Sequence, residues 1–170
     1  MHAPVVNDVS FRVLLIAKLV WKLKARIIDV ETAFLHGDLK EEIFMEIPPG
    51  MEASKDECLI LKKTIYELVQ SARQFYVKLV EALKGCGFEG SPVDPCLWTR
   101  NSSSGIVMMA IYVDDCLTIG TDTAIDEVIE SMKNYGFWLK VENDLTDYLS
   151  FKIVQDIDQG KAWIMQAHSI

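Results

Sequence analysis

Two apolar runs, residues 106–112 and 116–119, flank the short segment Val113-Asp114-Asp115. Each run has the length and composition of a buried strand, and the few residues between them leave room only for a tight turn. The sequence therefore predicts a β-hairpin with an acidic tip. Because aspartate tolerates turn conformations and bonds its own backbone, the aspartate pair taken alone also fits an ordinary turn.

The segments around the hairpin alternate between strand and helix patterns. Residues 26–30 form a short β-branched run, which predicts a buried strand ending near Asp29. Apolar residues keep helical spacing from residue 65 to 83, and a second such helix opens at Thr123 and stops at Gly136 before a strand at 138–141. The order strand, helix, hairpin, helix, strand predicts an α+β fold built on a split βαβ sheet, in which the first strand can lie beside the hairpin.

Further elements flank this pattern. A helix capped by Asn7 or Asp8 is apolar nearly all round as far as Val20, so we expect it to be buried. The remaining candidate strands are residues 43–47 with 58–61 as a hairpin, then 148–154 and 162–165.

Composition narrows the class of protein. The 170 residues, half of them hydrophobic, are enough for one domain with a substantial core. No apolar run approaches the ~20 residues of a membrane-spanning helix, and no signal peptide precedes the first element. The four cysteines form no C-x-x-C pair, so we expect neither a disulfide framework nor a zinc site, and a reducing intracellular setting is the default.

The net charge of −8 is unusual for a protein that acts on nucleic acid, because such proteins usually present a basic surface to the phosphate backbone. Asp29, at a strand end, and Asp114 and Asp115, at the hairpin tip, nevertheless form a candidate metal site if their strands are neighbours. Like charges that close raise each other's pKa unless a cation lies between them. Mg²⁺ prefers such oxygens, and two ions about 3.5–4 Å apart support phosphoryl transfer.

The residues around these carboxylates match a known pattern in order and spacing. Tyr112-Val113-Asp114-Asp115 resembles the Y-V-D-D hairpin of reverse transcriptases, and residues 29–39 resemble the D-V-x-T-A-F-L-N-G-x-L segment of copia-type (Pseudoviridae, Ty1/copia) retrotransposon enzymes. Residues 3–6, 61–66, 70–76, 87–88 and the Asp94-Pro95-Cys96-Leu97 segment also match that family. The chain is therefore similar over nearly its whole length to a copia-type polymerase palm, a ferredoxin-like antiparallel sheet packed on helices, with part of the fingers.

The resemblance implies roles for the acidic residues and for the nucleotide pocket. Asp29 and Asp114 would be the principal ligands of Mg²⁺, or of Mn²⁺ in its place, with Asp115 as the third carboxylate. Phe34 would be the aromatic gate that excludes a ribose 2′-OH, although it can equally be a core residue. Tyr66 and Lys140 would also lie near the incoming nucleotide, and a lysine at 140 can equally be merely exposed.

Other residues would contact the nucleic acid. Arg73 and Gln74 would face the template backbone, although Arg73 can equally be a solvated side chain. Tyr112 would lie near the primer end, although it can equally be an ordinary aromatic residue of a strand. Residues 148–153 correspond to the strand pair that grips the primer, with Ser150 where the family usually has glycine. Three departures are Glu67 for glycine, Val69 for lysine and Ala72 for proline; a carboxylate at 67 would repel a triphosphate.

These matches imply an RNA-directed DNA polymerase domain of a retrotransposon Pol polyprotein, which acts on an RNA/DNA template–primer and dNTP in cytoplasmic virus-like particles. We expect residues 1–170 to be a single, partial palm domain, with the basic fingers and the thumb and RNase H in other polyprotein regions. The location of the basic segments in other regions of the polyprotein would explain the net negative charge of this chain. It also predicts that the isolated chain is inactive. One alternative is a non-catalytic decayed or domesticated remnant acting as a binding module; another is an unrelated metal-dependent phosphohydrolase on the same kind of sheet.

Overall fold

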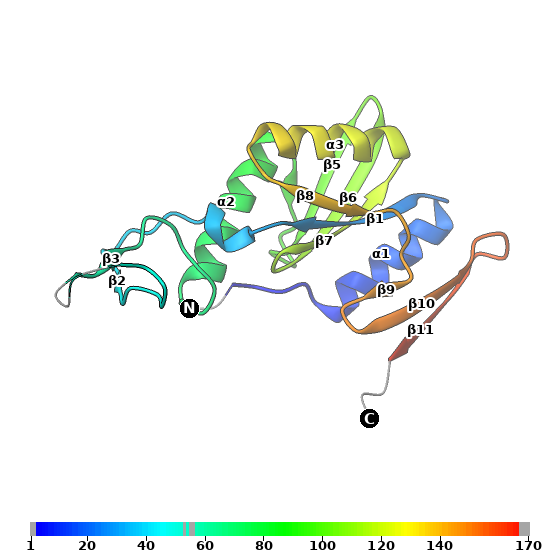
Figure 1. Ribbon diagram of the computed structural model, residues 1–170. Coiled ribbons are helices and arrows are strands. Elements are labelled where there is room, and N and C mark those ends of the chain that lie inside the picture. The colour runs from blue at the N-terminus through cyan, green and yellow to red at the C-terminus, as the bar shows by residue number, and fades with distance from the viewer. Residues whose placement is uncertain (1–2, 53, 55–56, 167–170) are drawn as a thin grey trace. The chain divides into compact units, whose positions relative to one another are not determined.

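A computed structural model describes residues 3–52, 54 and 57–166 of the chain. The chain divides into two compact units (Figure 1). One, here called the inserted unit, is formed mainly by Thr32–Val80; the other, the sheet unit, is formed by Pro4–Glu31 with Glu81–Ile170.

An antiparallel sheet of six strands forms the core of the sheet unit. Its order is β4-β5-β6-β7-β1-β8, with every neighbouring pair antiparallel. The strands are β1 (Lys24–Val30), β4 (Glu89–Gly90), β5 (Leu97–Ser102), β6 (Gly105–Tyr112), β7 (Asp115–Gly120) and β8 (Leu139–Glu142). The predicted α+β class is confirmed, and the first strand lies beside the hairpin.

Two helices cover this sheet, α3 (Asp122–Asn134) on one face and α1 (Asp8–Val20) on the other (Figure 1). Thr121 caps α3, so the helix begins just before the predicted Thr123. Its apolar stripe is buried as its spacing predicts, through Ile125, Val128, Ile129 and Met132. No helix in the described part of the chain is long and apolar enough to cross a membrane.

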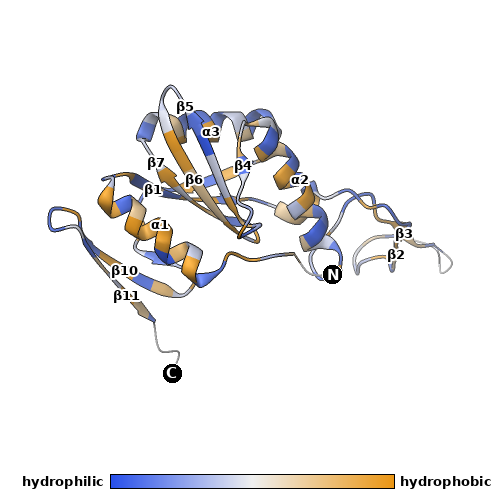
Figure 2. Ribbon diagram, turned by 180° about the vertical axis from the view of Figure 1, so that it is seen from behind, coloured by the Kyte–Doolittle hydropathy of each residue, from blue (hydrophilic) through white to orange (hydrophobic). Residues whose placement is uncertain are grey.

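The prediction that α1 is buried all round is wrong. Asn7 caps the helix as expected, and Phe11, Leu14, Leu15 and Lys18 are buried. The residues on its outer face, Val9, Val13, Ile16 and Val20, are 54 to 69 % exposed, and Figure 2 shows hydrophobic residues along this helix. The helix has apolar residues on both of its sides, but the sheet can cover only one side.

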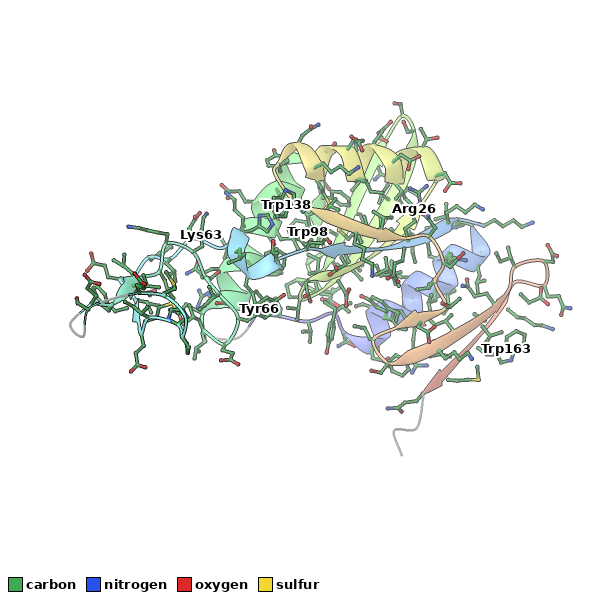
Figure 3. All side chains as sticks on the ribbon, viewed as in Figure 1. Arg26, Lys63, Tyr66, Trp98, Trp138 and Trp163 are labelled. Atoms are coloured by element: carbon green, nitrogen blue, oxygen red, sulfur yellow. The ribbon has the colours of Figure 1, made fainter. Side chains whose placement is uncertain are left out.

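A smaller sheet of three strands, in the order β11-β10-β9, follows β8. Its strands are β9 (Asp147–Tyr148), β10 (Phe151–Asp156) and β11 (Lys161–Gln166). Leu149 and Ser150 have φ of 50° and 66°, which splits the predicted strand at 148–154 into two. The ring of Phe11 on α1 lies 5.3 Å from that of Tyr148, so this sheet packs on the helix. Trp163 on the outer strand is half-exposed (Figure 3).

The inserted unit has little regular structure apart from the helix at its C-terminal end. The predicted hairpin is confirmed but short, with β2 (Phe44–Met45) paired to β3 (Leu59–Ile60), and Ala33–His36 form a 3₁₀ helix, η1, that periodicity did not predict. Helix α2 spans Ser71–Gly85, so the predicted start at residue 65 is wrong. Glu67 has a φ of 73°, which a right-handed helix excludes, and the Ser71 hydroxyl bonds the Ile65 carbonyl at 2.5 Å.

The four cysteines are free thiols in different surroundings. Cys58 is exposed, whereas Cys86, Cys96 and Cys116 are buried. Burial raises the pKa of Cys96 to about 12 and raises the pKa of Cys86 and Cys116 as well.

Candidate active site

The three predicted carboxylates come together at one end of the six-stranded sheet. Asp29 near the end of β1 is the register partner of Asp115 at the start of β7. Directly opposite residues in an antiparallel pair point to the same face of the sheet. The backbone N–H of Val30 also donates to the Asp114 carbonyl at 3.1 Å, which ties the hairpin tip to β1.

A tight two-residue turn holds Asp114 at the tip of the hairpin. Tyr112 and Asp115 are the last opposing pair, with Val113 and Asp114 between them. Val113 has a φ of 56°, the sign required at the first central position of a type II′ turn. A β-branched residue in the left-handed region is uncommon, and such strain is often retained at functional sites.

Burial and neighbouring negative charges both disfavour the ionised forms of Asp29 and Asp115. Burial, then the charges of Asp114 and Asp29, raise the pKa of Asp115. Burial and the charge of Asp114 likewise raise the pKa of Asp29, against the opposing effect of the Lys140 ammonium. The folded chain thus holds negative charges that a cation between them would relieve.

Lys140 brings a positive charge to the same sheet face. It is the β8 partner of Asp29, so Tyr112, Asp115, Asp29 and Lys140 form one row across four strands. Its Nζ lies 3.0 Å from an oxygen of Glu142, two residues along the same strand. The hydrogen bond to Glu142, followed by the charges of Glu142 and Asp29, raises the pKa of Lys140.

A surface cavity of about 280 Å³ opens beside this row. Asp29, Asp115 and Lys140 line it together with residues that the sequence did not single out for this place, Glu142 and Asp147. The sequence could have predicted Glu142, because it lies two residues after Lys140 on β8 and residues two apart on a strand share a face of the sheet. The remaining lining residues are Ile27, Tyr148, Leu149 and Ser150.

The metal site itself stays a prediction. Among the described residues, no three Asp, Glu, His or Cys side chains are arranged as a ready metal-binding group. The donor set still suits a hard divalent cation, because it consists of carboxylate oxygens, and burial together with neighbouring negative charges raises the pKa of Asp29 and Asp115.

The remaining predicted residues form a separate group in the inserted unit. Phe34 on η1 is half-buried, and its ring centroid lies 4.5 Å from that of Tyr66 in an edge-to-face arrangement. Tyr66 and the nearby Lys63 are labelled in Figure 3. Arg73 and Gln74, in the first turn of α2, line a cavity of about 260 Å³ together with Lys40, Glu41, Val69, Gln70 and Val77.

Comparison with known proteins decides the family. The family described as "Reverse transcriptase (RNA-dependent DNA polymerase)" matches residues 1–168 of the chain. The chain belongs to the reverse transcriptase family. No solved structure matches this reverse transcriptase chain.

The curated relatives of this reverse transcriptase chain are transposon polyproteins. It is 34% identical over 169 residues to the retrovirus-related Pol polyprotein from transposon TNT 1-94 of Nicotiana tabacum, which covers 98% of the chain and 13% of the relative. It is 33% identical over 160 residues to that from transposon RE2 of Arabidopsis thaliana, covering 93% and 11%. The truncated Ty1-A Gag-Pol polyprotein of Saccharomyces cerevisiae is 32% identical over 108 residues, covering 62% and 9%.

These matches confirm the copia-type resemblance and do not favour a non-catalytic remnant. The chain spans only about an eighth of the length of the tobacco relative. Two departures from the reverse transcriptase pattern coincide with backbone strain, since Glu67 and Ser150, where the pattern has glycine, have φ of 73° and 66°. Glycine adopts this conformation without a steric penalty, so the backbone accounts for the glycine that the resemblance implies at these two positions.

Proposed function

We propose that the sheet unit is the palm of an RNA-directed DNA polymerase. The sheet order β6-β7-β1-β8, with α2 between β1 and β6 and α3 between β7 and β8, supports this assignment. That connectivity is the βαββαβ arrangement expected of a split βαβ sheet. The observation that carries the proposal is the register of Asp29 with Asp115 beside the tip at Asp114.

In this proposal Asp29, Asp114 and Asp115 hold two Mg²⁺ ions, or Mn²⁺ in their place. The ions would stabilise charge on the attacking and leaving oxygens. The reaction joins the primer 3′-oxygen to the α-phosphorus of a dNTP and breaks the bond to pyrophosphate.

The chain's own residues orient the substrates. Lys140, in the same row as the carboxylates, supplies positive charge to the leaving pyrophosphate. Phe34, held against Tyr66, lies against the sugar and excludes a 2′-OH, while Tyr112 packs near the primer end. Arg73 and Gln74 contact the template backbone. RNA/DNA template–primer, dNTP and the remaining Pol regions are the proposed partners, in cytoplasmic virus-like particles.

Mn²⁺ titration of the isotopically labelled chain tests the carboxylate site. We expect paramagnetic broadening of NMR signals at residues 29 and 112–116 first. Asp114→Asn should weaken binding by roughly tenfold or more, the scale expected for losing a charged ligand. Asp158→Asn, which removes an equal charge from the exposed β10–β11 turn, should have no effect. Broadening spread evenly over acidic surface residues would contradict the proposal.

Primer extension tests the activity of the isolated chain. With poly(rA)·oligo(dT), dTTP and Mg²⁺ we expect no product, because the net charge of −8 disfavours binding to the phosphate backbone. Product that disappears in Asp114→Asn would confirm the polymerase site and refute the inactivity.

A further inference from the structure

The carboxylate of Asp94, just before β5, lies at a junction within the sheet unit. Asp94 is only 5 % exposed. Its Oδ2 accepts hydrogen bonds from the Asn7 backbone N–H at 3.1 Å and from the Ser10 hydroxyl at 2.5 Å. Its Oδ1 accepts a hydrogen bond from the Cys96 backbone N–H at 2.9 Å. One buried group therefore joins the start of α1 to the start of β5.

The segment just before β5 holds the end of β6 where β5 begins. The ladder between β5 and β6 begins with Leu97 opposite Ala110, so the last two residues of β6 lie beyond it. The next contact on that side is made by Cys96, whose carbonyl accepts the Ile111 N–H at 2.9 Å. The N–H of the same Cys96 is the one bound by Asp94.

The second segment continues the pairing toward the acidic tip. The Val6 N–H donates to the Ile111 carbonyl at 3.2 Å, and Val5 forms an isolated antiparallel bridge with Tyr112. Asn7, which follows directly, donates its N–H to Asp94. Both backbone segments that flank the end of β6 on the side away from β7 are thus fixed by the same carboxylate.

The surroundings of Asp94 favour its charged form. Burial opposes ionisation, but the hydrogen bonds from Ser10, Cys96 and Asn7 outweigh it and hold the pKa of Asp94 below its ordinary value. The position at the N-terminus of α1 also suits a negative charge. A charged acceptor that is buried and fully used is costly to replace by a neutral one.

We propose that Asp94 is a positioning residue for the acidic hairpin. By anchoring both flanking segments, its carboxylate fixes Tyr112 and hence the turn that presents Asp114 and Asp115. The catalytic meaning of this role rests on the proposed function, whereas the anchoring of the hairpin does not. The plain alternative is a staple that adds stability to the whole sheet unit equally.

Amide hydrogen exchange separates these roles. In Asp94→Asn we expect exchange at Val6 and Ile111 to quicken by roughly tenfold relative to the amides of β1, since a charged hydrogen bond is lost locally. Ser10→Ala should give a smaller change at the same amides. Asp126→Asn is the matched control, because Asp126 pairs with Arg26, which keeps its second partner Asp122 (Arg26 is labelled in Figure 3). A uniform rise across the sheet, or no change at Ile111, overturns the proposal.

Mn²⁺ affinity is the measurement that distinguishes a positioning role from a purely structural one, because a purely structural role would leave it unchanged. The dissociation constant, measured by broadening at residues 112–116, should rise about three- to tenfold in Asp94→Asn and stay unchanged in Asp126→Asn. Selective exchange with unaltered Mn²⁺ affinity would overturn the positioning role. If the unmodified chain binds no Mn²⁺, the proposed function fails, and the exchange result alone still decides whether Asp94 anchors the hairpin.

Discussion

The two units of the chain are stabilised by different interactions. The sheet unit contains the eight-residue strand β6, paired on both sides, and a core of side chains with no exposed surface, among them Val107, Met109, Ile111, Leu117 and Ile119. In the inserted unit the paired strands β2 and β3 have two residues each. Its backbone is held by isolated bonds, such as those from the Thr64 N–H to the Gly37 carbonyl and from the buried Thr64 hydroxyl to the Phe34 carbonyl.

This difference separates the two parts of the proposed site. The carboxylates stand on a sheet that fixes their register, whereas Phe34 and Tyr66 stand on a segment fixed by a few local bonds. Segments with few ladder hydrogen bonds open at lower free-energy cost than core strands. We infer that substitutions in the inserted unit leave the geometry of the carboxylates unchanged, while the aromatic pair is more sensitive to the loss of a local hydrogen bond.

The largest expected effect is on the core of the sheet. Leu117→Ala should lower the free energy of unfolding by about 2–5 kcal/mol, because Leu117 is 0 % exposed and its loss leaves a cavity. Leu35→Ala makes the same chemical change in the inserted unit, where Leu35 is 48 % exposed, and should cost about 1 kcal/mol or less. Urea unfolding measures both, and equal losses would contradict the contrast between the units.

A smaller effect is expected at Thr64. Thr64→Val should cost about 1 kcal/mol, since it removes the buried hydroxyl donor and leaves the Phe34 carbonyl with only the Gly37 N–H. NMR should show shifted ring signals for Phe34 and Tyr66 with the β1 and β7 amides unchanged. Thr64→Ser keeps the hydroxyl and should retain the ring signals; shifts that spread through β1 and β7 would mean that the two units are not independently stabilised.

The carboxylate site should reduce stability in a pH-dependent way. The pKa of Asp115 is raised in the folded chain, so folding binds protons and stability falls as pH rises through the raised value. Asp115→Asn should therefore stabilise the chain at pH 7 by ~0.5–1 kcal/mol, the range for like charges opposite on strands. The gain should vanish below the ordinary aspartate pKa of about 3.9. Thermal unfolding from pH 3 to 8 measures it, and a gain that persists at pH 3 would exclude charge repulsion as the cause.

The smallest effects are expected at the two strained positions. Glu67→Gly in the inserted unit and Ser150→Gly in the sheet unit should each add about 0.5 kcal/mol, because glycine removes the cost of a positive φ but loses more chain entropy on folding. That corresponds to a rise of roughly 1–2 °C in the unfolding temperature. Glu67→Ala keeps the Cβ and should give no gain; an equal gain would assign the effect to the charge of Glu67 instead.

Periodicity predicted the sheet unit better than the inserted unit for a physical reason. The apolar stripe of α3 and the apolar runs of the hairpin are buried within the sheet unit. Burial of this kind produces apolar residues at helical or strand spacing, which can be read directly from the sequence. The 3₁₀ helix at Phe34 and the late start of α2 follow from positive φ at Thr32 and Glu67, and single backbone dihedrals leave no periodic trace.

The same limit applies to the site. Asp29 beside Asp115 followed from the predicted order of strands, because neighbouring strands fix which residues oppose one another. Glu142 could have been found from its spacing to Lys140 on β8, whereas Asp147 became a site residue only through the path of the chain into β9. The burial of α1 was misjudged because composition does not tell how many of a helix's faces have a partner.

The difference in exposure among the four cysteines allows chemical labelling of the chain at a single residue, Cys58. Thiolate is the nucleophile in alkylation, so the buried thiols with raised pKa should react slowly at neutral pH while Cys58 reacts readily. A maleimide dye or spin label would therefore attach almost entirely to the inserted unit of the unmutated chain. Introducing one further surface cysteine in the sheet unit would then give a second labelling position, so that each unit carries one defined probe.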